Sequence, residues 1–328
     1  MDRTVFNAGE YTVSQKDVWK ARKRIAPFVQ KTPLIYSEML SNQYETSIYL
    51  KLEQLNTSGS FKIRGAANKI LSLSKTEKKR GITTFSTGNF GRSVAYVANG
   101  LGIRAVICIS KRVPESKVTL LEHMGAEVVR VGYSQDDAQT YSYQLQREKG
   151  LTLIHPFDDA LVIAGQGTIG LEVLDDAPGV DTMIAGLSGG GLHAGLGATL
   201  KTTSQKMRLI GVSTEKGAAM YESICAGKPM IVQEQDTLAD SLLGGIGQNN
   251  RYTFEMVKQH VDEIVLVNET EIADGMKHMF HHEKMIVEGA AGAGIGALKH
   301  GKFTLGEKIV FIITGSSVDS ATILNVMQ

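Results

Sequence analysis

A single lysine follows a run of small polar residues that could aim its amine into a cleft. Lys62 comes shortly after the segment 56–60, which is rich in turn-forming residues, and just before a plausible helix. In such a cleft, desolvation or a nearby cation lowers the pKa of the amine and frees its lone pair to attack a carbonyl. This is the chemistry of a Schiff-base lysine. Because most lysines are solvated surface residues, the interpretation depends on other motifs.

A glycine triplet offers a possible anion site. Residues 188–191 read Ser-Gly-Gly-Gly, and they follow an apolar run and precede a helical pattern. Glycines let backbone N–H groups approach an anion, and the N-terminus of a helix adds a favourable dipole. The pattern predicts a phosphate cradle, although a tight turn explains the triplet equally well when it is taken alone.

The segment that contains this glycine triplet also resembles a dinucleotide-binding unit, so a nicotinamide-dependent oxidoreductase is an alternative. A strand at 182–187, the glycine turn, a helix and a strand ending near Glu215 follow the nicotinamide pattern. The glycines are spaced one position too widely for GxGxxG. A literal GxGxxG at 165–170 lacks a clear strand before it, so we interpret it as a helix-packing feature.

Two further polar loops lie where strands are expected to end. The segment 86–89, Ser-Thr-Gly-Asn, lies between a strand and a helix, so its N–H groups and hydroxyls could bind a carboxylate. A helix N-cap is the alternative use of these residues. Thr314 ends the last buried strand, where a hydroxyl bonded to backbone is as good an explanation as a ligand contact.

Taken in order, these segments resemble the motifs of one enzyme family. SGSFKIRG, STGNFGR, SGGGL and TGSSVD are similar to those of the fold type II pyridoxal-phosphate (PLP) enzymes, and within them of the serine/threonine dehydratase and serine racemase family. The likeness extends from about Val18 to Asp319. It implies an α/β fold of two doubly wound, mainly parallel-sheet domains, tryptophan synthase β-like, with PLP in the cleft between them.

The resemblance also implies a role for each motif residue. Lys62 is the catalytic residue and holds PLP, the glycine loop holds the phosphate, Asn89 faces the phenolic oxygen and Thr314 faces the pyridine nitrogen. The implied cofactor-binding residues are Phe61, Lys62, Asn89, Ser188, Gly189, Gly190, Gly191, Leu192 and Thr314. The implied substrate-binding residues are Ser86, Thr87, Gly88, Asn89 and Phe90. Family members usually have His where this chain has Phe90, which leaves the identity of the substrate open.

The activity implied by the resemblance is β-elimination from a β-hydroxy amino acid, giving a 2-oxo acid and ammonia. The strings PFDDA, EKGAAM and TLADSLLGGIGQNNR look closest to hydroxyectoine-utilisation dehydratases, so a hydroxylated diamino acid derivative is a candidate substrate. Serine racemase-like activity is an alternative, weakened because Thr87 stands where a racemase has Ser. A binding protein that has kept the fold without catalysis is the third possibility.

No metal site is expected. Glu215 resembles a cation ligand of some family members, but Tyr221 replaces the acidic residue expected six positions on, so a cation is left open and not favoured. The histidines at 278–282 spread around a helix at their spacing and predict a solvated face. Asp158 and Asp159 could pair as an acid and a base, but capping of the helix that follows them is the favoured prediction.

The elements that position these motifs alternate between strand and helix patterns. A helix is predicted from Ser14 to Ala26, and a strand at 47–53 leads into the lysine segment. Further strands are predicted at 82–85, 105–109, 127–131, 152–155, 182–187, 209–213 and 308–314. Further helices are predicted at 91–100, 115–124, 134–149, 162–174, 192–202, 218–226, 252–260 and 269–283. This alternation favours parallel sheets, with residues 79–156 as a smaller substrate-loop domain and residues 1–78 and 157–328 as a larger PLP-binding domain.

Composition excludes several classes of protein. Of the 328 residues, 42% are hydrophobic and 21% are charged, as in an ordinary globular protein. A net charge of +1 gives no field that would attract nucleic acid or an anionic membrane. The two cysteines suit a reducing compartment, and no long apolar run is present. We therefore expect a soluble cytoplasmic enzyme with an amino acid substrate, and by family analogy a homodimer.

Overall fold

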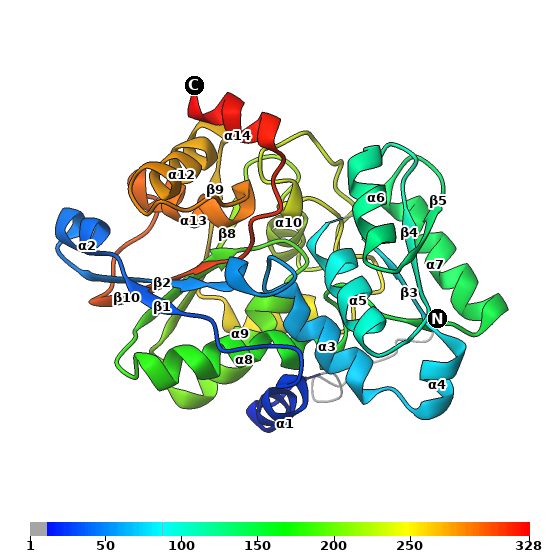
Figure 1. Ribbon diagram of the computed structural model, residues 1–328. Helices are drawn as coiled ribbons and strands as arrows, with labels where there is room; N and C mark the ends of the chain where they lie inside the picture. The colour runs from blue at the N-terminus through cyan, green and yellow to red at the C-terminus, as the bar shows by residue number, and fades with distance from the viewer. Residues whose placement is uncertain (1–11, 87) are drawn as a thin grey trace.

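A computed structural model of the protein describes residues 12–86 and 88–328. Its strands form two sheets, each flanked by helices (Figure 1). The larger sheet has the order β1 (Leu34–Tyr36), β2 (Ser47–Leu52), β10 (Lys308–Ile313), β7 (Thr182–Gly186), β8 (Arg208–Thr214) and β9 (Glu263–Val267). The smaller sheet has the order β5 (Glu127–Arg130), β4 (Ala105–Ile109), β3 (Ile82–Phe85) and β6 (Thr152–Leu153).

Fourteen α-helices connect and cover these strands in the described part of the chain. They are α1 (Gln15–Ile25), α2 (Glu38–Tyr44), α3 (Lys62–Ser72), α4 (Lys75–Arg80), α5 (Asn89–Gly100), α6 (Glu115–His123), α7 (Gln135–Lys149), α8 (Ala160–Asp176), α9 (Gly191–Thr203), α10 (Ala219–Ala226), α11 (Thr253–His260), α12 (Glu269–His281), α13 (Gly289–Lys299) and α14 (Ser320–Met327). Two 3₁₀ turns, η1 (Glu53–Leu55) and η2 (Asp240–Leu242), lie in the connections.

The smaller sheet is covered by helices on both faces, as alternate residues of β4 make clear. Ile107 and Ile109 pack with residues of α5 and α6. Cys108, between them in sequence, packs with Ala138 of α7. Because successive strand residues point to opposite faces, the helices lie on opposite sides of the sheet. All pairings within this sheet are parallel, and its central strands are continuous buried apolar runs, as such sheets require.

The larger sheet is wound in the same way. On one face, Ile309 and Phe311 of β10 pack with residues of α12 and α13. On the other face, Val310 and Ile312 pack with residues of α8 and α9. Figure 1 shows these two helical layers above and below the strands. Every described pairing is parallel except β1 with β2, so the predicted α/β class with two doubly wound, mainly parallel sheets is confirmed.

The predicted elements between residues 81 and 314 are all present, with ends that agree within two residues. The smaller sheet takes its strands from residues 82–153, and the larger sheet takes them from 34–52 and 182–313. The domain bounds at 79 and 156 stay a prediction. The sequence analysis did not predict β1, β9, α2, α13 or α14.

The predicted solvated histidine face of α12 is wrong for one of its residues. His278 is buried, with its ring 4.8 Å from the ring of His282. Its Nε2 atom lies 3.7 Å from Oε1 of Glu283, which also accepts a hydrogen bond from Ser37. His278 is therefore covered by Glu283 and His282 and does not belong to a solvated face.

The GxGxxG of residues 165–170 is confirmed as a helix-packing feature of α8. A Cβ atom on Gly165 would lie 2.4 Å from the carbonyl oxygen of Arg64 in α3, and one on Gly167 would lie 2.7 Å from that of Gly195 in α9. Both contacts are with backbone, so neither can be relieved by a side-chain rotation. These glycines let α8 lie against α3, the helix that begins at Lys62, and against α9.

Gly165→Ala is therefore expected to destabilise the protein. The overpacking costs about 1–3 kcal/mol, beyond the gain of about 1 kcal/mol that alanine brings inside a helix. Urea unfolding followed by far-UV circular dichroism measures the change. Gly179→Ala is the matched control, because a Cβ atom there would meet only the flexible end of Lys308 at 3.4 Å. An unchanged midpoint for Gly165→Ala would contradict the packing argument.

Candidate active site

A cavity lies where residues from several elements converge at the ends of strands. It is lined by Phe61 and Lys62 at the start of α3, Asn89 at the start of α5, the loop between β7 and α9, and the residue after β10. All nine residues predicted to bind the cofactor are among its lining: Phe61, Lys62, Asn89, Ser188, Gly189, Gly190, Gly191, Leu192 and Thr314. The sequence analysis assigned no site role to the other lining residues, which are Phe157, Gly186, His193, Ser241, Leu242, Glu288 and Ala290.

The lysine segment is held against the end of β10 by backbone hydrogen bonds. Phe61 N donates to Thr314 O at 3.0 Å, and Ser316 N donates to Gly59 O at 3.1 Å. Gly59 has a φ of +79°, a backbone conformation that favours glycine, so it supplies the turn before the lysine. Lys62 is consequently fixed at the first position of α3, with its Nζ 5.0 Å from the centre of the Phe61 ring.

The amine of Lys62 lies inside the cavity, although the residue as a whole is half-buried. Burial disfavours its charged form and lowers its pKa to about 8, while the negative charge of Glu288 raises the pKa in part. A substantial fraction of the amine is therefore neutral near pH 8, as a nucleophile or base must be.

Acylation of Lys62 in the cofactor-free protein is expected to report this pKa. Its rate should rise with pH to a midpoint of about 8, against 10.5 for an ordinary lysine. In Glu288→Gln the midpoint should fall further, because the carboxylate that stabilises the ammonium form is gone. Mass spectrometry of the Lys62 peptide after a short pulse of acetic anhydride measures the rate, with free Nα-acetyl-lysine in the same tube as reference. A midpoint equal to that of the reference would mean that the amine is solvated.

The glycine loop after β7 forms a backbone cradle at the N-terminus of α9. Gly190 has a φ of +84°, and no side chain of the described residues caps the helix there. A Cβ atom on Gly189 would lie 2.5 Å from the ring of Phe157, and one on Gly191 would lie 3.0 Å from the Phe157 carbonyl oxygen. Only glycines fit here, and the N–H groups at this helix N-terminus make a site suited to a phosphate.

The ring of Phe157 is fixed against this cradle by its neighbours. The ring of His155 packs against it at 4.7 Å, and His155 Nδ1 accepts a hydrogen bond from Asp158 N at 2.9 Å. Burial lowers the pKa of His155 to about 4, so the ring is neutral near pH 7 and its nitrogen can accept that bond.

Asp158 and Asp159 have separate structural roles. Asp159 caps α8 as predicted, accepting from Leu161 N and Val162 N. The prediction is wrong for Asp158, whose carboxylate accepts from three successive N–H groups ahead of and at the start of α11. The chain turns between the two residues, so only the second faces the helix that follows.

Asn89, Glu288 and Thr314 form the polar wall of the cavity. Asn89 Nδ2 donates to both carboxylate oxygens of Glu288 at 2.9 Å, and Ser317 N donates to Glu288 Oε2 at 3.0 Å. Burial raises the pKa of Glu288, and the bond from Asn89 opposes that effect. Asn89 Oδ1 and Thr314 Oγ1 are buried and have no hydrogen-bond partner among the described residues. Buried polar atoms are rarely left unpaired, so both atoms indicate a ligand that would complete them.

The predicted substrate loop is only partly brought to this cavity. Asn89 lines it, but Ser86, Gly88 and Phe90 are absent from its described lining, and Thr87 lies outside the described residues. Phe90 is buried in an apolar cluster with Ile63 and Val94, because the second residue of α5 points into the hydrophobic side of that helix. This burial differs from the expectation that Phe90 lies beside the substrate. The role of residues 86–90 in substrate binding stays a prediction.

The described residues contain no group of three or more His, Cys, Asp or Glu side chains that could hold a metal ion. A cation near Glu215 therefore gains no support. Within residues 12–86 and 88–328, none of the helices has the length and apolar character needed to cross a membrane.

The residues present fit PLP. The glycine cradle suits its phosphate, the unpaired Asn89 Oδ1 and Thr314 Oγ1 lie in the same cavity to contact polar atoms of its ring, and the Lys62 amine can bond to its aldehyde. Phe61 and Phe157 supply aromatic contact on the walls.

Comparison with known proteins gives the same assignment. The family model described as pyridoxal-phosphate dependent enzyme matches residues 25–315. The chain is 46% identical to a provisionally named threonine dehydratase from Sinorhizobium fredii, over 94% of this chain and 93% of that protein. It is 38% identical to L-threonine ammonia-lyase from Thermotoga maritima, over 94% of this chain and 76% of that protein. The structure of maize serine racemase is similar with a TM-score of 0.90 at 32% identity, covering 97% of both chains.

These likenesses cover nearly the whole chain, including Lys62 and the glycine cradle, and they set aside the nicotinamide alternative. The cofactor is pyridoxal phosphate, and the fold is the tryptophan synthase β-like fold type II. The chain belongs to the family of pyridoxal-phosphate dependent enzymes.

Proposed function

We propose that this enzyme is an ammonia-lyase that converts a β-hydroxy amino acid to a 2-oxo acid and ammonia. The observation that carries the proposal is the buried amine of Lys62 in one cavity with the glycine cradle and the Thr314 hydroxyl. Relatives named threonine dehydratase and L-threonine ammonia-lyase, at 46% and 38% identity, support the reaction class.

Each cavity residue has a proposed task in this reaction. When bound, PLP withdraws electrons from the α-carbon and makes its proton acidic. Lys62 would hold the cofactor, and its amine, once free, would take the α-proton. Its pKa of about 8 suits a base that works near neutral pH. The N–H groups of Gly189 to Gly191 would hold the phosphate. Asn89, which is oriented by its bonds to Glu288, would contact the phenolic oxygen.

Thr314 is proposed to favour elimination over transamination. Its hydroxyl is neutral, so it does not stabilise a protonated pyridine nitrogen as a carboxylate would. A weaker electron sink suits loss of the β-hydroxyl. The segment Ser86 to Phe90 is proposed to bind the substrate carboxylate through N–H groups and hydroxyls at the start of α5.

For the substrate we propose a hydroxylated diamino acid derivative, in a role in hydroxyectoine utilisation. The support is the likeness of PFDDA, EKGAAM and TLADSLLGGIGQNNR to those dehydratases. Steady-state release of 2-oxo acid from L-serine, L-threonine and a hydroxylated diamino acid tests the point. The highest kcat/KM is expected for the diamino acid. A strong preference for L-threonine would remove this substrate while leaving the ammonia-lyase, and no 2-oxo acid from any of them would overturn both.

Racemisation is a second candidate, favoured by the likeness to maize serine racemase. Incubation with L-serine and chiral chromatography of the remaining amino acid would detect it. We expect 2-oxo acid to exceed D-serine, since Thr87 stands where a racemase has Ser.

We also propose that the enzyme is a homodimer, on the analogy with its family. Light scattering of the purified protein tests this, and a mass near the 35.5 kDa of one chain would contradict it.

A further inference from the structure

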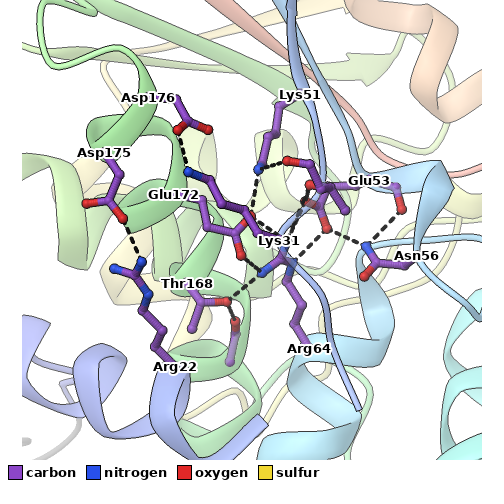
Figure 2. Close-up of polar contacts among 12 residues, drawn as sticks. Arg22, Lys31, Lys51, Glu53, Asn56, Arg64, Thr168, Glu172, Asp175 and Asp176 are labelled. Carbon is purple, nitrogen blue, oxygen red and sulfur yellow. Dashed lines mark hydrogen bonds and ion pairs between the residues drawn. The ribbon is translucent and has the colours of Figure 1, made fainter. Parts of the chain in front are cut away.

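A cluster of buried charges lies beside Asn56 and Arg64, the two ends of the segment 56–64 that contains Lys62 (Figure 2). Lys51, Glu53 and Arg64 are fully buried, and Glu172 of α8 is nearly so. Arg64 donates to Glu53 Oε2 from Nε at 2.7 Å and to Glu172 Oε1 from Nη1 at 2.6 Å. Lys51 Nζ donates to Glu172 Oε2 at 2.6 Å. The negative charges of Glu53 and Glu172 thus balance the positive charges of Lys51 and Arg64 inside the protein.

Such a cluster is not explained by stability alone. Taking charges out of water is costly, and replacing a buried ion pair by apolar residues is often neutral or stabilising. A buried ionic group that fixes one particular arrangement has a better-attested use. We therefore expect these charges to hold a neighbouring segment in place. Lys62 is two residues before Arg64 in the same helix.

Glu53 differs from Glu172 in what else it binds. Asn56, the first residue of the lysine segment, donates from Nδ2 to Glu53 Oε2 at 2.7 Å and to Glu53 O at 2.9 Å. The same carboxylate accepts from Nε and Nη2 of Arg64. Glu53 therefore contacts both ends of the segment 56–64, and Lys62 lies between them. Among the described residues, Glu172 bonds to Arg64 and Lys51 but not to Asn56.

We propose that Glu53 is a positioning residue: its buried carboxylate joins Asn56 to Arg64, closes the base of the segment 56–64, and so fixes where the amine of Lys62 points. Other bonds also hold the segment, namely its backbone bonds to Thr314 and Ser316, the bond between Ser58 and Ser93, and the bonds of Arg64 to Thr168 and Glu172, but among the described contacts only the Glu53 carboxylate joins its two ends. Glu172 completes the pairing of Arg64 and balances the charge, without touching the far end of the segment. The effect on turnover rests on the proposed function, whereas the effect on the segment does not.

Glu53→Gln and Glu172→Gln form a matched pair of variants for the test. Each removes one buried negative charge from the same guanidinium, and Glu172→Gln also removes the bonded carboxylate of Lys51, so we expect its urea midpoint to fall at least as far as that of Glu53→Gln. Only Glu53→Gln weakens the closure of the segment, and kcat should fall by about tenfold or more with KM within about threefold, because misplacing a reacting group by a fraction of an ångström is costly. Glu172→Gln should keep kcat within about threefold of wild type.

Asn56→Ala removes the hydrogen bonds from the Asn56 side chain to Glu53 without removing any charge. It should keep more stability than either glutamine variant and reproduce the fall in kcat. Hydrogen–deuterium exchange of the cofactor-free proteins supplies a readout independent of activity. The amides of 56–64 should exchange faster in Glu53→Gln and Asn56→Ala than in Glu172→Gln.

Equal exchange of the segment in all four proteins would overturn the positioning role, as would a loss of kcat in Glu172→Gln as large as in Glu53→Gln. If Glu53→Gln fails to fold, Asn56→Ala against wild type decides the question by the same two measurements. If wild-type protein releases no 2-oxo acid, the proposed function fails, while the exchange comparison still decides whether Glu53 closes the segment.

Discussion

The Lys62→Ala protein is expected to release no 2-oxo acid above background, with kcat lowered by about a thousandfold or more. It loses both the covalent attachment of the cofactor and the base that takes the α-proton. Steady-state assay measures the loss of turnover. Borohydride reduction followed by mass spectrometry measures the loss of covalent attachment, since wild-type protein should retain the mass of the cofactor on the Lys62 peptide and the variant should not.

The fold of Lys62→Ala should be unaffected, because the side chain projects into the cavity and donates no hydrogen bond from its amine to a described residue. Lys75→Ala, at an exposed position of α4, is the control for loss of a lysine and should keep wild-type turnover. Turnover of substrate by Lys62→Ala at a rate comparable to that of wild type would contradict the assignment of Lys62 as the catalytic residue.

Glu288→Gln is expected to lower kcat by about a hundredfold while leaving PLP bound. In the wild type, both carboxylate oxygens accept from Asn89 Nδ2, and the acid is buried beside Lys62. The amide of Gln brings a donor toward the donor of Asn89, so Asn89 must turn or move. The phenolic oxygen of the cofactor would then lose its partner, and the Lys62 amine would lose the charge that raises its pKa.

Steady-state kinetics and the visible absorbance of the bound cofactor measure these effects. Asp240→Asn is the control, because Asp240 is an exposed carboxylate whose charge acts on Glu288 from outside the cavity lining. Its kcat should stay within about threefold of wild type. Equal kcat for Glu288→Gln and wild type would show that Asn89 needs no such orientation.

The parts of the site that sequence could predict are those carried by short local motifs. Lys62, the glycines after β7 and Thr314 each stand beside a strand or helix end that periodicity identifies, and all line one cavity. Glu288 could not be found in this way. It is 226 residues beyond Lys62 and is followed by α13, a helix of small residues that is buried all round and so has no amphipathic pattern.

The buried charges were missed for a different reason. A pattern of apolar and polar residues places Lys51 and Glu53 at a surface, because charged side chains are seldom buried unless they are paired. Their partners, Arg64 and Glu172, come from α3 and α8, and only the packing of those helices brings them together. The same limit applies to Phe90 and His278, whose directions depend on neighbours that are distant in sequence.

The order of strands in the larger sheet has a consequence for biosynthesis. β2 pairs along its length with β10, and the lysine segment is bonded to Thr314 and Ser316 just beyond that strand. A growing chain exposes β2 early but cannot complete this pairing until β10 has left the ribosome, whereas the strands of the four-stranded sheet, residues 82–153, are available much sooner. The contacts that hold the lysine segment against β10 can therefore form only after residues 308–316 have been synthesised, later than the whole of the smaller sheet.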